Sequence, residues 1–312
     1  MPVGPAAAPG PADPPRRIGF IGLGVMGRHM ARHLLAAGHR LTGFDTDPSA
    51  GADLPRAASA AEAVDGAEVV FTMLPQGQAV AEAVAAMGPA LAPGAILVDC
   101  SSAEPWQTRQ TGAALAERGV AMVDAPVSGA EWGARDARLV FMAGGAAADL
   151  ERVRPLLMRM GRAVFHLGPL GAGHAMKALN NVVTALTALV TTEAMLAGKA
   201  AGLSPAAMCA VLNASTGQSF WSAERLSQDV LNRAFADGFR LSLMRKDVEI
   251  ACRLAEEVGI AVPLISMGRA MWAEADRALP GAPVTAIVRW QEDRAGLTLT
   301  EDPDPQRESR EP

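Results

Sequence analysis

Several features that mark particular classes of protein are scarce in this sequence. Its 312 residues include three cysteines, Cys100, Cys209 and Cys252, whose spacing indicates neither a CxxC metal site nor a disulfide framework. The formal net charge is -5 and no run of lysine or arginine occurs, so we expect no nucleic-acid partner and no electrostatic membrane anchor. The sequence therefore favours a small-molecule partner and a reducing, cytoplasmic environment.

Signals for export and membrane insertion are also weak. Residues 1–15 (MPVGPAAAPGPADPP) are too rich in proline and too weakly apolar for the core of a signal peptide, and they predict a disordered tail. The most apolar stretch, residues 182–198, contains threonine and glutamate and is shorter than the roughly 20 apolar residues that span a bilayer. We expect this stretch to form a buried helix, with no membrane association.

Lysine is scarce as well. Of the 28 lysines and arginines, only Lys177, Lys199 and Lys246 are lysine. An arginine side chain, whose pKa lies above about 12, cannot give and regain a proton near neutral pH. Because this chain mostly uses arginine for positive charge, each lysine is a candidate for proton transfer.

The length exceeds that of one typical domain, and 50% of the residues are hydrophobic, so we predict two packed domains. In the first half, short apolar runs alternate with helical patterns. Strands are predicted at 18–22, 41–45, 69–74, 95–100, 120–126 and 139–145, and helices at 26–37, 78–91, 105–118 and 149–160. This alternation predicts an α/β domain with a doubly wound parallel sheet, a Rossmann domain, over residues 16–170.

Strand signals largely stop after Gly173, and a second, all-helical domain is predicted over residues 171–299. The glycines and proline of HLGPLGAGHA (166–175) mark the boundary. Helices are predicted at about 174–200, 204–213, 220–235, 243–258, 262–278 and 284–294. Residues 300–312 are polar and contain proline, which predicts a disordered tail.

A glycine-rich motif follows the first predicted strand and opens the first predicted helix. It consists of Gly22, Leu23, Gly24, Val25, Met26 and Gly27. In this GxGxxG spacing Gly22 permits the turn, Gly24 lets a pyrophosphate approach, and Gly27 brings the helix against the sheet, where its N-terminus attracts phosphate. A tight turn without a nucleotide would explain the glycines alone.

Asp45 ends the next predicted strand, near the spacing of about 20 residues that is typical of a ribose-binding acid. A 2′-phosphate at this position would meet negative charge from both Asp45 and Asp47, and neither Thr46 nor Asp47 supplies an arginine. We therefore expect NAD in preference to NADP. The alternative is that Asp45 is a solvated acid at the end of a strand.

Two histidines of the first helix, His29 and His33, share the i, i+4 spacing of some metal ligands. No third ligand is evident and both lie near the predicted phosphate site. We predict no metal site.

Lys177 lies one helical turn before Asn181, so both side chains project from one face of the helix that opens the second domain. One residue could move a proton while the other positions a substrate. The alternative is a lysine that extends from a helix towards solvent beside a polar neighbour.

Four motifs together resemble the 3-hydroxyisobutyrate dehydrogenase family of β-hydroxyacid dehydrogenases, which are similar to 6-phosphogluconate dehydrogenase. They are GFIGLGVMG at 19–27, DAPVSGA at 124–130, GAGHAMKALNN at 171–181 and LMRKD at 243–247. The resemblance implies a Rossmann domain followed by a helical substrate and dimerisation domain, an active site between them, and a homodimer or homotetramer.

The resemblance also implies roles for individual residues. Lys177 would be the catalytic acid/base, Ser128 and Gly129 would bind the substrate carboxylate, Asn181 would hold the substrate with support from Asp247, and Leu74, Pro75, Ser102 and Lys246 would contact the cofactor. The residue types fit, because a Ser-Gly turn offers a hydroxyl and a backbone N–H to an anion. Ordinary turns and strand ends would use the same residues.

Three departures from the family pattern bear on the substrate. Ala130, followed by Glu131 and Trp132, stands where a second glycine is common, and Ala79 stands where relatives often have an amide near the nicotinamide. The segment 213–224 contains Phe220 and Trp221 without an obvious carboxylate-binding arginine nearby. These aromatic residues are core residues or shape the substrate end.

We therefore expect an NAD-dependent oxidoreductase for a small anionic 3-hydroxy acid or its semialdehyde, in which Lys177 removes the hydroxyl proton as hydride passes to NAD. The leading substrate is 3-hydroxyisobutyrate, and tartronate semialdehyde (2-hydroxy-3-oxopropionate) reduction is an alternative. An imine reductase shares the two-domain plan but generally lacks this lysine. A nucleotide sensor without enzyme activity would need the glycine motif and Asp45 but not the second-domain residues.

Overall fold

The structure, a computed structural model, describes residues 14–300. Apart from Pro14, Pro15 and Thr300, the two predicted tails lie outside the described residues. The chain forms two compact units, the first ending at Lys177 and the second beginning at Ala178. This division falls inside one helix, whereas the sequence places the domain boundary between residues 170 and 171.

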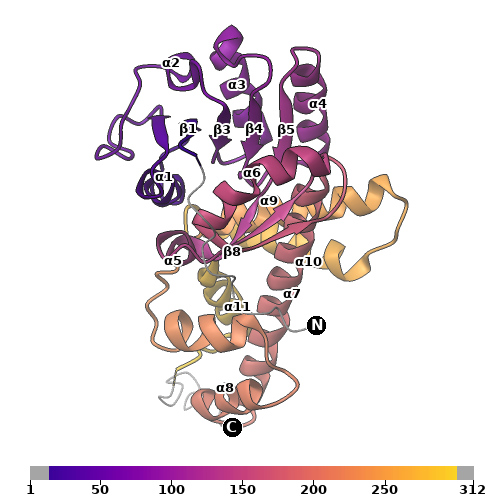
Figure 1. Cartoon of the computed structure of the whole chain (residues 1–312). Coiled ribbons are helices and arrows are strands. Elements are labelled where there is room, and N and C mark those ends of the chain that lie inside the picture. Colours follow the sequence, from indigo (N-terminus) through magenta and orange to yellow (C-terminus); the bar gives the residue numbers. More distant parts are fainter. Residues whose placement is uncertain (1–13, 301–312) are drawn as a thin grey trace. The chain divides into compact units, whose positions relative to one another are not determined.

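The first unit is built on a five-stranded parallel sheet, drawn in indigo to purple in Figure 1. Its strands are β1 (Arg17–Ile21), β2 (Arg40–Phe44), β3 (Val69–Thr72), β4 (Ile96–Asp99) and β5 (Ala121–Asp124), in the order β2-β1-β3-β4-β5. The chain leaves β1 on one side to form β2 and returns on the other to form β3. Parallel sheets of this kind bind ligands at the carboxyl ends of the strands beside such a reversal.

Helices connect these strands as the α/β prediction requires. They are α1 (Gly27–Ala36), α2 (Ala60–Val64), α3 (Gly77–Met87) with the short η1 (Gly88–Ala90), α4 (Pro105–Ala116), α5 (Ala130–Arg135) and α6 (Ala147–Met160). The four predicted helices correspond to α1, α3, α4 and α6. Helices α2 and α5, of 5 and 6 residues, were not predicted because fewer than two turns carry no helical period.

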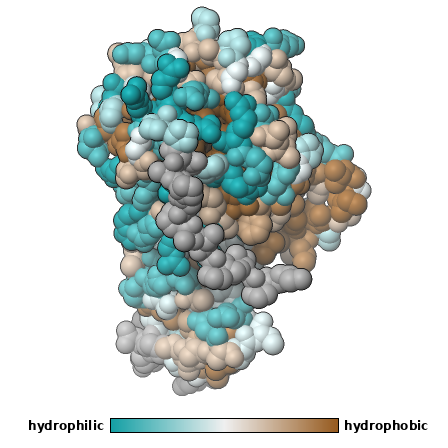
Figure 2. Space-filling view, in the orientation of Figure 1, coloured by the Kyte–Doolittle hydropathy of each residue, from teal (hydrophilic) through white to brown (hydrophobic). Residues whose placement is uncertain are grey.

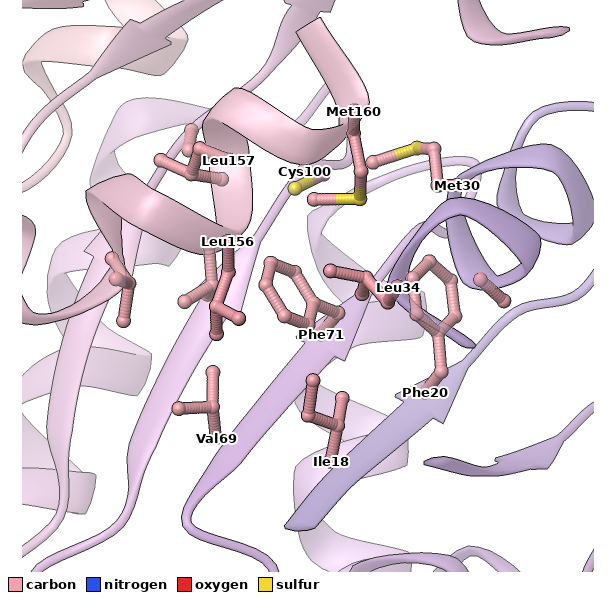
Figure 3. Packing of buried hydrophobic residues seen from close by; sticks show 14 of the residues in the cluster. Ile18, Phe20, Met30, Leu34, Val69, Phe71, Cys100, Leu156, Leu157 and Met160 are labelled. Carbon is pink, nitrogen blue, oxygen red and sulfur yellow. The ribbon is translucent and has the colours of Figure 1, made fainter. Parts of the chain in front are cut away.

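The core of the sheet explains the apolar strand sequences. Figure 3 shows Leu156, Leu157 and Met160 of α6 over the side chains of β1 and β3. The rings of Phe20 and Phe71 stack with centroids 5.8 Å apart. Strands that are covered on both faces must be apolar along their whole length, which is why these segments read as continuous hydrophobic runs.

The predicted strand at 139–145 is present, but it does not extend the main sheet. It forms β7 (Leu139–Ala143) in a second sheet with β6 (Val127–Ser128) and β8 (Gly161–His166), in the order β6-β7-β8. Strand β6 runs antiparallel to β7, and β8 runs parallel to it. Neither β6 nor β8 was predicted, since β6 has two residues and β8 starts on a glycine that directly follows α6.

Helix α7 (Ala172–Ala200) begins in the first unit and continues into the second. The remaining helices are α8 (Pro205–Ala214), the π-helix η2 (Trp221–Val230), α9 (Leu241–Glu257), α10 (Pro263–Ala278), η3 (Val284–Ala286) and α11 (Ile287–Ala295). All six predicted helical segments are therefore present, with 220–235 as a shorter π-helix. Between residues 178 and 300 the described chain forms no strand beyond an isolated bridge of Arg240 with Pro283.

Helix α7 has 29 residues and is long and apolar enough to cross a membrane by length and composition alone. The core helix of a soluble protein passes the same test, and 44% of the most apolar window is buried. The predicted buried helix is thus only partly buried, with Val183 and Val190 at least 60% exposed.

Candidate active site

The glycine motif connects β1 to α1 as predicted. Gly22 has a φ of +95°, and a Cβ atom there would collide with the carbonyl of Met73. A Cβ on Gly27 would collide with the carbonyl of Gly22, so α1 approaches the turn too closely for any side chain. A Cβ on Gly24 would instead meet nothing within 4 Å. The turn is thus closed on its inner side and open at the residue where a pyrophosphate would approach.

Asp45 follows β2 and is fixed beside this turn. Its Oδ2 accepts a hydrogen bond from the backbone N–H of Leu23 at 2.7 Å, and its Oδ1 accepts one from the N–H of Asp47 at 2.9 Å. The carboxylate is half-buried and keeps lone pairs for further donors. The glycine turn and Asp45 together fit the dinucleotide that the sequence predicts, because the open turn and the acid lie at the carboxyl ends of the paired strands β1 and β2.

The neighbouring turn contains an arginine that sequence reasoning missed. The Arg56 guanidinium donates to the backbone carbonyls of Asp45 at 3.1 Å and Asp47 at 3.2 Å, and also to that of Ala50. The hydroxyl and N–H of Ser49 both donate to Asp47 and hold the pKa of that carboxyl below its usual value. Asp47 is therefore ionised at neutral pH, while the nearby guanidinium is occupied by backbone carbonyls.

The loops after β3 and β4 are joined by side-chain hydrogen bonds. The N–H of Leu74 donates to Ser101 Oγ at 2.9 Å, and the N–H of Gly77 donates to Glu104 Oε2 at 3.1 Å. These bonds connect the segment of Leu74 and Pro75 to the residues on both sides of Ser102. The sequence analysis named Leu74, Pro75 and Ser102 in these loops. It did not name Ser101 and Glu104, whose side chains hold the two loops together.

Ser128 is the last residue of β6, and Gly129 connects it to α5. Gly129 has a φ of +138°, and Ala130, the first residue of α5, has a φ of +53°. A left-handed conformation is costly for any residue with a Cβ and is natural for glycine. The chain therefore holds Ala130 in a backbone conformation that glycine adopts at lower cost.

Helix α5 is tied to α1 through the residues after this turn. Glu131 Oε1 accepts a hydrogen bond from Arg28 Nη2 at 2.7 Å and lies 3.3 Å from His29 Nε2. Partial burial raises the pKa of Glu131, but the bonds to His29 and Arg28 outweigh this effect and the pKa is lowered. His33 Nε2 lies 2.9 Å from the carbonyl of Ala134. Both histidines thus contact α5, and residues 14–300 contain no group of three metal-ligating side chains.

Lys177 lies in the second turn of α7 and is half-buried. It is the last residue of the first unit, which also holds the glycine turn, Asp45 and Ser128. Asn181 follows one turn later on the same helix.

In the second unit the structure brings Asn181, Lys246 and Asp247 together. Asn181 Nδ2 donates to Asp247 Oδ2 at 2.5 Å, and Lys246 Nζ lies 3.3 Å from Asp247 Oδ1. Asp247 is 1% exposed and Asn181 is 6% exposed. The buried carboxylate therefore fixes the orientation of the Asn181 amide and balances the charge of Lys246.

The aromatic pair of the second unit divides into a core residue and a surface residue. Trp221 is 1% exposed, whereas Phe220 is 50% exposed and its ring lies 5.6 Å from the guanidinium carbon of Arg225. Arg225 also donates to Asp229 at 3.0 Å. An arginine thus does lie beside Phe220, in the next turn of the chain, although it is already paired with a carboxylate.

The sequence and fold match known proteins over nearly the whole described chain. Residues 17–168 match the NAD-binding domain of 6-phosphogluconate dehydrogenase, and residues 171–291 match the NAD-binding domain of NADP-dependent 3-hydroxyisobutyrate dehydrogenase. An NAD-dependent L-serine dehydrogenase of Pseudomonas aeruginosa is 38% identical over 82% of this chain and 91% of its own length. A 3-hydroxyisobutyrate dehydrogenase of the same organism is 37% identical over 87% of this chain and 97% of its own length.

A solved structure of Mycobacterium tuberculosis 3-hydroxyisobutyrate dehydrogenase with L-serine has a similar fold, with a TM-score of 0.83 and 33% identity. The match covers 89% of this chain and 99% of that one.

Proposed function

The chain belongs to the 3-hydroxyisobutyrate dehydrogenase family and is an NAD-dependent hydroxyacid dehydrogenase, and from this premise we propose that Lys177 is its proton-transfer residue. The observation that carries the proposal is the position of this rare lysine. It lies in the compact unit that holds the glycine turn and Asp45, early in a helix that begins beside the ends of the parallel strands.

The chemical step divides between the cofactor and the protein. Bound NAD would accept the hydride that leaves the carbon carrying the hydroxyl. The amine of Lys177 accepts the hydroxyl proton during oxidation and returns it during reduction of the aldehyde, as a general base and general acid. Arginine could not perform this exchange, which accounts for a lysine here in a chain that mostly uses arginine.

The other family positions receive supporting roles in this proposal. Ser128 Oγ and the N–H of Gly129 bind the substrate carboxylate, since both are donors in a turn that has no bulky side chain at Gly129. Asn181 binds the substrate and is oriented by Asp247. The cofactor contacts are assigned to the glycine turn, Asp45, Leu74, Pro75, Ser102 and Lys246.

The proposed substrates are small 3-hydroxy acids with a primary hydroxyl, and 3-hydroxyisobutyrate is the first candidate. L-Serine is the second, because one relative is named for it and one similar structure contains it. The two acids share the carboxylate and the hydroxymethyl group and differ at the carbon between them, where one has a methyl group and the other an ammonium group. Tartronate semialdehyde remains an alternative for the reverse reaction.

The test is a cofactor-linked screen with the purified full-length protein. NADH formation is followed with 3-hydroxyisobutyrate and L-serine, and NADH consumption with tartronate semialdehyde and a cyclic imine. We expect turnover of at least one of the three acid substrates, and its loss in Lys177→Ala. Turnover of the cyclic imine alone would identify an imine reductase, and NAD binding without any turnover would identify a nucleotide sensor.

We also propose a homodimer or homotetramer, with a second copy of the chain on the turn between α9 and α10. Figure 2 shows brown, hydrophobic atoms over this turn. Val258, Ile260, Leu264 and Met267 are between 62 and 70% exposed there, more than a monomeric soluble protein ordinarily leaves together. In sedimentation velocity, Leu264→Glu should lower the oligomeric state, whereas Met158→Glu on α6 should not. An unchanged sedimentation coefficient for Leu264→Glu would remove this turn from the interface.

The remaining assignments concern domains and compartment. We propose that residues 16–170 bind the cofactor, that residues 171–299 serve the substrate and dimerisation, and that the protein works in the cytoplasm. All three cysteines are free and buried, as suits a reducing compartment. Burial, together with the neighbouring Asp99, raises the pKa of the Cys100 thiol well above its usual value, so this thiol is not reactive.

A further inference from the structure

Two buried aspartates end neighbouring strands of the main sheet. Asp99 is the last residue of β4 and Asp124 the last of β5, and the two are direct partners in the strand register. They are 1% and 0% exposed. Two carboxylates placed side by side in a protein interior are unfavourable unless hydrogen bonds and opposite charge compensate them. Their partners therefore show what the arrangement does.

Asp124 caps the start of α7. Its Oδ1 accepts the N–H of Gly171 at 2.7 Å and its Oδ2 accepts the N–H of His174 at 2.8 Å. The first N–H groups of a helix have no partner within the helix, and a carboxylate also complements the positive end of the helix dipole. A residue 47 positions earlier in the chain thus fixes the first turn of α7 against the sheet.

The His174 side chain provides a second attachment. Its Nδ1 lies 2.8 Å from Thr108 Oγ1 and its Nε2 lies 3.1 Å from the carbonyl of Ser101, which requires a proton on Nε2 because a carbonyl only accepts. The ring also lies 3.6 Å from Asp124 Oδ2 and 3.7 Å from Asp99 Oδ2. Because the ring is fully buried, these contacts fix the rotation of α7 about its own axis.

The same network continues to the loops that we assign to the cofactor. Asp99 Oδ1 accepts hydrogen bonds from Thr72 Oγ1 at 2.9 Å and from the N–H of Ser101 at 3.0 Å. Ser101 Oγ in turn accepts the N–H of Leu74 at 2.9 Å. One buried set of hydrogen bonds therefore holds both the loops after β3 and β4 and the start of α7.

Two glycines show how tightly the Asp124 carboxylate is enclosed. A Cβ on Gly173 would lie 2.8 Å from Asp124 Oδ2, and one on Gly144 would lie 2.5 Å from Asp124 Oδ1. Neither distance is possible for a real side chain. The carboxylate is thus packed against two backbones and cannot take another position without moving one of them.

We propose that Asp124 and His174 are positioning residues that set the place of Lys177 relative to the cofactor loops. Lys177 lies three residues after His174, within one helical turn of both attachments. A shift of about 1 Å at a reacting group can cost about 10²-fold in rate, so a fixed helix start has direct value for proton transfer. This inference rests on the proposed function of Lys177.

The first test is Asp124→Asn, which keeps the side-chain shape but turns an amide NH₂ towards one of the two backbone N–H groups. We expect kcat to fall about 10- to 100-fold while the KM for NAD stays within about twofold. The control is Leu157→Ala, a fully buried α6 residue outside the network. It should lower the unfolding temperature at least as much and leave kcat within about twofold.

A matched pair at Thr108 separates positioning from stability and decides the matter if Asp124→Asn does not fold. Thr108→Val removes the hydroxyl that contacts His174 and keeps the shape, whereas Thr108→Ser keeps the hydroxyl. We expect a fall in kcat with Thr108→Val and near wild-type kcat with Thr108→Ser, with the KM for NAD unchanged in both.

Failure of this inference is distinguishable from failure of the proposed function. If Lys177→Ala abolishes turnover while Thr108→Val and a folded Asp124→Asn keep wild-type kcat, Lys177 acts without this network and the inference is wrong. If Lys177→Ala itself keeps wild-type kcat, the proposed function of Lys177 is wrong.

Discussion

Asp45 and Asp124 make the same kind of contact at the ends of two strands, but they differ in what the contact holds. Each carboxylate accepts two backbone N–H groups. Asp45 is half-buried and holds its own turn and the glycine turn that follows the neighbouring strand β1. Asp124 is fully buried and holds a helix 47 residues away. We call the glycine turn and Asp45 the nucleotide end of this unit, and this end is built from local spacing. We call Ser128 and Lys177, with Asp124 and His174, the chemical end, and this end depends on contacts between distant segments.

The comparison predicts that substitutions at the two ends affect different steps. Changes at the chemical end should lower turnover and leave NAD binding intact. Changes at the nucleotide end should alter cofactor choice and leave the proton transfer intact.

The largest effect is expected for Lys177→Arg, because arginine keeps the positive charge but cannot exchange a proton. We expect kcat to fall about 10²- to 10⁴-fold, the range of general acid–base catalysis, with NAD affinity unchanged. The measurements are steady-state kinetics at saturating substrate and cofactor, and NAD titration by fluorescence. In Lys177→Ala, small primary amines in their basic form should restore part of the turnover, which controls for misplaced bulk in the arginine variant. Near wild-type kcat in both variants would reject the role of Lys177.

Ser128→Ala should have the next largest effect, because it removes one of the two donors that we propose for the substrate carboxylate. We expect a loss of about 1.5–3 kcal/mol in kcat/KM, as for a hydrogen bond to a charged group, and no change in NAD affinity. Kinetics with each active substrate test this. If NAD affinity falls instead, Ser128 contributes to cofactor binding and does not act on the substrate alone.

Asp45→Ala tests the nucleotide end and should narrow the preference for NAD over NADP. In our proposal the variant loses both the ribose hydrogen bond of Asp45 and its repulsion of a 2′-phosphate. Since the carboxylate is half-exposed, we expect a change of about 1 kcal/mol in the ratio of the two kcat/KM values. If the wild-type protein prefers NADP, the proposed role of Asp45 in selecting NAD is wrong.

The smallest effect is expected for Ala130→Gly. Glycine relieves the left-handed conformation of Ala130 but adds freedom to the unfolded chain, so the net gain in stability should stay below about 1 kcal/mol. Ala137→Gly is the matched control, because Ala137 has the same φ of +53° after α5. Both variants should raise the unfolding midpoint slightly, but only Ala130→Gly should change the KM for the acid. If the two variants have equal KM values for the acid, the backbone conformation of Ala130 does not affect substrate binding.

The arrangement of the glycine turn and Asp45 was predictable from the sequence because its signals are short-range. The glycine turn follows from spacing within six residues, and Asp45 from its place after the next strand. The long helices of the second unit were equally predictable from their apolar period. The second sheet was not predicted, because β6 is too short to carry a pattern and β7 looks like any strand of the main sheet.

The supporting residues of the chemical end were missed for a similar reason. Asp124 and His174 lie inside the motifs DAPVSGA and GAGHAMKALNN, yet nothing in either motif shows that the two pair. Three residues on the cofactor side, Ser101, Glu104 and Arg56, were missed as well, because they bind backbone groups of other loops and no local pattern reveals such contacts. Asn181 was named from its spacing to Lys177 and from family resemblance, and Asp247 from the resemblance alone; the structure shows the hydrogen bond between them.

Helix α7 spans the border between the two compact units, and this affects the design of chimeras between this enzyme and a relative. A chimera joined at the border between the compact units, after Lys177, would take Lys177 from one parent and Asn181 from the other, on a spliced helix. A chimera joined before Gly171 would keep that helix whole but place a foreign first turn on the Asp124 carboxylate. Exchange of the second unit should therefore succeed best when the donor also supplies glycine at 173 and histidine at 174, because these two residues fit the host sheet.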